Sequence, residues 1–115
     1  MISLLVTVPA ESSRMLWLLN FLESNALSSI CIFLSDDAAR VAVKRVSDES
    51  TLCSIQKRLH AWAKSNNYRI PVCRTALKNS ASDSMELADG FEVSELGQWV
   101  EDSANARHVL HWGDV

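Results

Sequence analysis

Short apolar runs alternate with amphipathic helical stripes along this chain, and the alternation restricts its possible folds more than any other feature. The predicted strands are residues 2–8, 28–34, 68–72, 90–93 and 107–112. The first predicted helix carries its apolar stripe at Met15, Leu18, Leu19 and Leu22, and the second at Leu52, Ile55, Leu59 and Trp62. Such an order of strands and helices favours parallel pairing, because each helix can carry the chain back to start the next strand.

The remaining segments complete this pattern. Residues 35–50 form a longer connection with room for a helical turn, and residues 74–88 predict a short, broken helical region. Ser94 is expected to cap a last helix that buries Leu96, Trp99 and Val100. The sequence therefore predicts one α/β domain over residues 1–115, with a mostly parallel sheet of about five strands and helices on both faces.

Charge is unevenly distributed although the net charge is only −3. Residues 40–78 carry nine of the eleven basic side chains, whereas residues 79–102 carry seven acids and no base. Two solvated faces would explain this layout. A basic neighbourhood around Cys73, beside an acidic surface that could dock a partner, would explain it as well. Overall acidity, and the lack of aromatic residues among the basic ones, argue against direct binding of nucleic acid.

Signals for export, membrane insertion and cofactors are missing from the sequence. The apolar N-terminus has no preceding basic region, and no run approaches the length of a membrane span, so a cytoplasmic protein is expected. The cysteines and histidines lack metal-ligand spacing, and no phosphate-binding glycine motif occurs, so neither metal nor organic cofactor is expected. The pair Asp36–Asp37 is interpreted as part of a solvated loop.

The three cysteines differ in their predicted surroundings. Cys31 lies inside a strand and is expected to be a buried structural thiol, while Cys53 lies in the first turn of a helix and is expected to be partly buried. Cys73 ends a strand and precedes a helix-prone stretch, with Arg74 directly after it. Backbone N–H groups at a helix start and a nearby cation stabilise a thiolate, so Cys73 is the candidate nucleophile. An ordinary core cysteine at a strand end is the competing interpretation.

Two stretches carry a resemblance to a known family. "IPVCRTAL" and "GFEVSELGQWVEDSANARHVLHWG" together resemble the DsrE/TusD family of sulfur-relay proteins. The resemblance implies a flavodoxin-like, DsrE-type fold and a sulfurtransferase role in which Cys73 accepts sulfane sulfur as a persulfide. It implies transfer to a downstream acceptor, in tRNA thiolation or in sulfur oxidation. Because a persulfide is anionic at neutral pH, Arg74 is expected to stabilise it.

The resemblance also implies partners, namely sulfur donor and acceptor proteins and either paralogous subunits or further copies of the chain. An oligomer is expected to form through apolar contacts near the C-terminal half, where Trp99 and Trp112 are candidate anchors. Two rival hypotheses stay open. The chain could be a non-catalytic subunit of the same fold, or a flavodoxin-like domain of another family that binds a small ligand.

Overall fold

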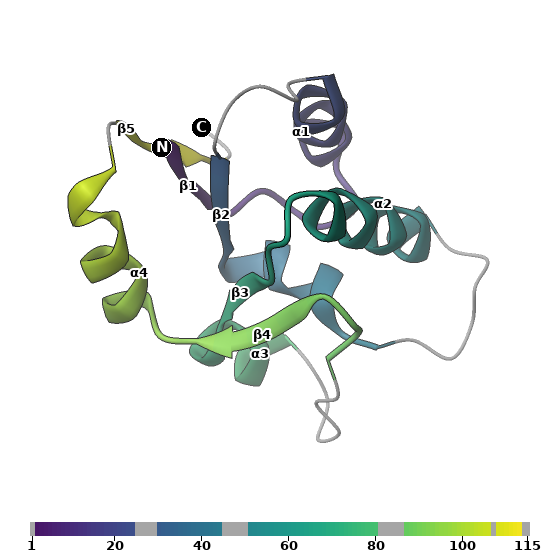
Figure 1. The fold of residues 1–115 in the computed structure, drawn as a ribbon. Helices are drawn as coiled ribbons and strands as arrows, with labels where there is room; N and C mark the ends of the chain where they lie inside the picture. Colours follow the sequence, from purple (N-terminus) through teal and green to yellow (C-terminus); the bar gives the residue numbers. More distant parts are fainter. Residues whose placement is uncertain (1, 25–29, 45–50, 81–86, 107, 114–115) are drawn as a thin grey trace.

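A five-stranded parallel sheet forms the centre of the molecule (Figure 1). The computed structural model describes residues 2–24, 30–44, 51–80, 87–106 and 108–113. The strands lie in the order β4-β3-β2-β1-β5. Their bounds are Ile2–Val6 for β1, Ile30–Leu34 for β2, Ile70–Cys73 for β3, Phe91–Ser94 for β4 and His108–Trp112 for β5. The predicted α/β class and parallel sheet are confirmed.

Helices lie on both sides of this sheet, as expected (Figure 1). Helices α1 (Ser13–Ser24) and α2 (Thr51–Ser65) pack against each other on one face. Helix α4 (Leu96–Asp102) and the short 3-10 helix η2 (Ser103–Asn105) lie on the other. At the carboxyl end of the strands, α3 (Arg74–Ser80) packs against the 3-10 helix η1 (Asp36–Ala42).

The apolar stripes of the first two helices form much of the core. All four stripe residues of α1 are at most 1% exposed, and Leu52, Ile55 and Leu59 of α2 are buried as well. Trp62 is only half-buried and meets the Tyr68 ring edge-on. Within the described residues, no helix is long and apolar enough to cross a membrane.

The segment around α4 differs from the prediction. Ser94 is the last residue of β4, and Glu95 takes the N-cap position instead. Leu96 and Val100 are exposed, while Trp99 is half-buried and packs against Phe33 of the sheet. Helix α4 has only seven residues, so about one of its turns contacts the sheet. The apolar side chains of Leu96 and Val100 lie outside this contact and face outward.

Some predicted segments extend beyond the described residues. These are residues 28 and 29 of the second predicted strand, residues 45–50 of the predicted connection, residues 81–86 of the predicted broken helix, and residue 107 of the last strand. Residues 74–80 do form a helix, and the longer connection after β2 contains η1, as its composition had suggested.

The alternation of side chains along the strands sorts residues between the two faces. Ser3 points to the α4 side, where its Oγ lies 2.6 Å from that of Ser103. Parallel register places Cys31 and Phe33 on the same side, and Phe33 meets Trp99 there. The register also brings the carboxyl ends of β2, β3 and β4 to one edge of the sheet, which is where parallel sheets carry their functional groups.

Candidate functional site

Cys73 lies at the carboxyl end of β3, near the ends of two neighbouring strands. Leu34 at the end of β2 pairs with Val72, and Ser94 at the end of β4 pairs with Cys73 itself. Helix α3 begins at the next residue, Arg74, so the chain turns away from the sheet directly after the thiol. The first N–H groups of a helix have no intrahelical acceptor, which makes this turn a polar neighbourhood for the sulfur.

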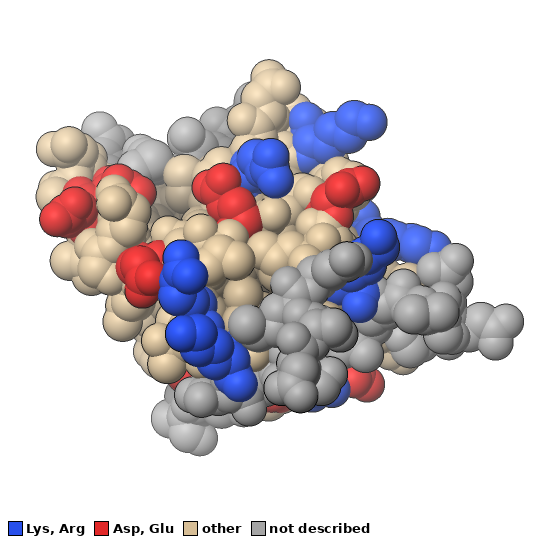
Figure 2. Space-filling view, turned by 90° about the horizontal axis from the view of Figure 1, so that it is seen from below, with Lys and Arg blue, Asp and Glu red and all other residues tan. Residues whose placement is uncertain are grey.

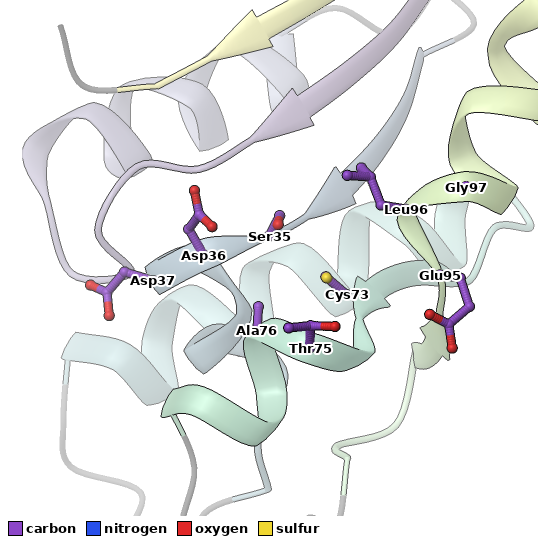
Figure 3. Close-up of a pocket in the computed structure, with 9 residues that line it drawn as sticks. All are labelled: Ser35, Asp36, Asp37, Cys73, Thr75, Ala76, Glu95, Leu96 and Gly97. Carbon is purple, nitrogen blue, oxygen red and sulfur yellow. The ribbon is translucent and has the colours of Figure 1, made fainter.

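A cavity of about 600 Å³ opens beside Cys73 (Figure 3). Its lining residues come from the ends of β2, β3 and β4 and from the elements that follow them. They are Ser35, Asp36, Asp37, Cys73, Thr75, Ala76, Glu95, Leu96 and Gly97. Cys73 lies in the middle of this group and is 8% exposed, so a reagent that reaches its sulfur has to enter the cavity.

Among the described residues that line the cavity, the ionisable groups other than Cys73 are all carboxylates. Asp36, Asp37 and Glu95 contribute these side chains, and no described lysine, arginine or histidine lines it. Of the two interpretations of the charge layout, the basic neighbourhood around Cys73 does not describe this part of the cavity wall. Acidic and basic side chains stand next to each other on the face seen in Figure 2 instead of occupying separate areas.

Asp36 is solvent-exposed and Asp37 partly exposed, as the sequence had suggested, but they do not lie in a loop. They begin η1, and both border the cavity. The strand-end rule could have found them, because residues that follow β2 must come close to residues that follow the adjacent β3.

Two arginines near the cavity are held in ion pairs. The Arg74 Nε donates a hydrogen bond of 2.7 Å to Glu95 Oε1, and both side chains are more than half exposed. Arg40 lies 3.5 Å from Asp37 and 3.4 Å from Glu11. Arg74 thus follows the thiol in sequence but directs its guanidinium to Glu95, and its role toward a persulfide stays a prediction.

The other two cysteines occupy different surroundings. Cys53 is 3% exposed in α2 and does not line the cavity of Cys73. Cys31, expected to be buried, is partly exposed and borders a smaller cavity of about 160 Å³ next to Tyr68 and Trp99. Burial raises the pKa of the Cys31 thiol, although a hydrogen bond with Tyr68 opposes this effect. Cys31 is therefore expected to stay a neutral thiol at neutral pH.

Metal-ligating side chains are dispersed in the described part of the chain, where no three His, Cys, Asp or Glu residues could hold a metal ion together. Two of the three histidines have structural contacts instead. The imidazole of His111 is hydrogen-bonded to the Thr7 hydroxyl, and His60 packs close to Gly90.

Comparison with known proteins agrees with this geometry. The model of the DsrE/DsrF-like family matches residues 3–112, which is nearly the whole chain. The chain belongs to the DsrE/DsrF-like family. Membership explains the sequence resemblance that surrounds Cys73 and is consistent with a role related to sulfur relay. No curated protein sequence matches the chain significantly.

A solved structure shares the fold of this DsrE/DsrF-like chain. The crystal structure of the YchN protein from E. coli superimposes with a TM-score of 0.67 at 18% sequence identity. The similarity covers 96% of this chain and 97% of that protein. At this identity the likeness establishes the common architecture alone.

Proposed function

We propose that this protein is a sulfur carrier, a sulfurtransferase subunit that accepts sulfane sulfur on Cys73 and passes it to a downstream acceptor. The observation that carries the proposal is the position of Cys73. It is the cysteine at the carboxyl end of a central strand, and it is the one that borders the 600 Å³ cavity. Family membership supports the same role, whether the relay serves tRNA thiolation or sulfur oxidation.

The transfer requires only thiol–disulfide chemistry. The Cys73 thiolate attacks the outer sulfur of a donor persulfide, and a new S–S bond forms on Cys73. The S–S bond of the donor breaks, and its electron pair leaves with the donor as a thiolate. The outer sulfur keeps its oxidation state and its exchangeable proton, so the step needs no external oxidant, metal or organic cofactor. An acceptor thiolate then attacks the outer sulfur of the Cys73 persulfide in the same way, and Cys73 leaves as a thiolate.

The low exposure of Cys73 suits a carrier. A persulfide at the surface would lose its outer sulfur to any solvent thiol, whereas one inside a cavity is met only by groups that fit there. Arg74 is the proposed stabiliser of the persulfide anion, and this role requires its guanidinium to leave Glu95 at least in part.

Protein partners belong to this proposal. Donor and acceptor proteins must each present a sulfur at the cavity, and we place this relay in the cytoplasm, without direct contact to nucleic acid or membrane. The same proposal treats residues 1–115 as one functional domain. It also includes assembly with paralogous subunits or with further copies of the chain, since Leu96, Val100 and Val109 expose apolar surface in the C-terminal half.

Intact-mass spectrometry after incubation with an uncharged sulfane-sulfur donor tests the proposal. We expect a gain equal to one sulfur atom that disappears on reduction and maps to the peptide containing Cys73. The variant Cys73→Ser should not load, while Cys31→Ser and Cys53→Ser should load like the unaltered protein. Equal loading of Cys73→Ser would refute the assignment, and loading of none of these proteins would favour a non-catalytic subunit.

A further inference from the structure

We infer that Asp36 is a specificity-determining residue that makes the Cys73 cavity selective against small anions. The physiological sulfur partners would then be neutral or cationic, such as a cysteine flanked by basic side chains on a protein segment. Anionic small thiols and sulfite would be disfavoured. The identity of these partners rests on the proposed function, but the charge selectivity itself is a property of the cavity.

The described wall of the cavity carries a net negative charge. Three carboxylates line it, and two of them have an arginine partner that does not line it itself. Glu95 is paired with Arg74, and Asp37 shares Arg40 with Glu11. Among the described residues, Asp36 has no hydrogen-bond or ion-pair partner. The carboxylate at this wall that no cation neutralises is therefore Asp36.

The charge of Asp36 lies at the same cavity as the thiol of Cys73. Asp36 and Cys73 border the same hollow from neighbouring strand ends, with Ser35 between them in the view of Figure 3. Cys73 is 8% exposed, so a reactant passes the wall before it reaches the sulfur. Concave sites with low-dielectric walls focus the field of their charges and change the local concentration of ions about tenfold or more.

The backbone holds Asp36 in an unusual conformation. Its φ angle is +52°, a left-handed value that aspartate and asparagine adopt more readily than other residues. The substitution Asp36→Asn should therefore keep the fold and remove only the charge, which makes the inference testable with one conservative variant.

The experiment measures how fast Cys73 reacts with methanethiosulfonate reagents that differ in charge. Each reagent transfers its sulfenyl group to the thiolate and releases methanesulfinate, and peptide mapping identifies the product at Cys73. The anionic sulfonatoethyl and the cationic trimethylammonioethyl reagents are compared at low ionic strength, and the neutral methyl reagent reports general access. We expect Asp36→Asn to raise the anionic-to-cationic rate ratio about threefold to tenfold.

Asp89→Asn is the matched control, because it removes the same charge near Gly90, away from the cavity wall. We expect this variant to leave the ratio unchanged, and salt to reduce the selectivity of the unaltered protein. An unchanged ratio in Asp36→Asn, or an equal change in both variants, would overturn the inference. The assay does not depend on persulfide loading. A protein that loads no sulfur yet discriminates by charge would refute the proposed function alone.

Discussion

At the scale of single residues, we predict that competition for Arg74 governs how well a persulfide on Cys73 is stabilised. Arg74 directly follows Cys73 in the sequence, but its guanidinium donates a hydrogen bond of 2.7 Å to Glu95. Both partners are more than half exposed, so solvent weakens the ion pair to roughly 1 kcal/mol or less. A pair this weak can open and close readily, which allows Arg74 to serve a second anion.

We predict opposite effects from substituting the two partners. Arg74→Gln should shorten the lifetime of the loaded Cys73, and Glu95→Gln should lengthen it. The expected factor is about two to five, which corresponds to roughly 0.4–1 kcal/mol for an exposed pair. Mass spectrometry of the loaded protein over time measures the lifetime. If Glu95→Gln acts through Arg74, its effect should vanish in the double variant; an equal effect there would instead point to the charge of Glu95 itself.

Gly90 is a second residue whose identity the structure explains. Its φ angle is +94°, a value that disfavours other residues. A Cβ atom at this position would lie 2.5 Å from Cδ2 of His60, so the substitution adds a steric conflict to the backbone strain.

We predict that Gly90→Ala lowers the free energy of unfolding by about 1–3 kcal/mol, as measured by urea denaturation. Gly97→Ala is the control, because a Cβ atom added at that position would meet no neighbouring group within 4 Å. Combining Gly90→Ala with His60→Ala should recover the steric part only. Equal stability of the two single glycine variants would contradict the argument.

At the scale of the elements, an ion pair links the two helices that cover one face of the sheet. The Arg58 Nε of α2 lies 3.1 Å from Oε2 of Glu23 in α1, and the Arg58 Nη2 also donates to Asn20 at 2.9 Å. The hydrogen bond from Arg58 holds the pKa of the Glu23 carboxyl below its ordinary value. This pair is partly exposed, so its contribution is discounted for screening by solvent.

The lowered pKa gives a pH-dependent prediction. A carboxyl group whose pKa falls on folding stabilises the protein above its unfolded pKa of about 4.3, and the effect is lost as the pH falls through the lowered folded value. Glu23→Gln should therefore cost up to about 1 kcal/mol near neutral pH, and the difference should disappear in acid. Denaturation across the pH range measures it.

Glu92→Gln provides the comparison for this pair, because Glu92 lies 3.9 Å from Arg69 and both are more than half exposed. It should change the stability at neutral pH by less than Glu23→Gln does. A cost for Glu23→Gln that stays constant into acid would show that the ion pair is not its source.

At the scale of the whole molecule, the distribution of exposed apolar side chains bears on assembly. Val100 of α4 and Val109 of β5 are both more than half exposed. The two tryptophans expected to anchor an interface are partly buried instead. Trp99 packs on Phe33, and Trp112 stacks on Trp17 at a ring distance of 5.0 Å. Trp17 is the tryptophan with an exposed ring, at 56%.

We predict that the purified protein forms an oligomer through the apolar surface of α4 and β5. Light scattering at micromolar concentration should give a mass well above 12.8 kDa. Val100→Lys should shift the assembly toward the monomer, because it places a charge in an apolar contact. Ala61→Lys, on the exposed side of α2, should leave it intact.

The assembly would lose its support if the measured mass stays near 12.8 kDa in two samples. These are the protein purified alone and the protein purified with co-expressed paralogues. If charged segments steer the association, salt should slow it. If the oligomer forms at the same rate at high salt, the prediction of an apolar contact stands. The prediction that charged segments steer the association would then be wrong.

The sequence by itself determined the parts of this protein that depend on local pattern. Apolar spacing in α1 specified which four residues enter the core, and all four are buried. The order of strands and helices specified a parallel sheet, and the end of the third strand placed Cys73 at its functional edge. These features follow from periodicity and chain direction, which a sequence carries directly.

Only the tertiary structure decided what surrounds Cys73 and what stays exposed. Glu95 reaches Arg74 from the carboxyl end of β4, and Asp36 comes to the cavity from the end of β2. Val100 has the spacing of a core residue yet faces outward, because the short α4 meets the sheet mainly through Trp99. Contacts of this kind depend on how strands pair and how helices cross them, and no local pattern specifies those distances.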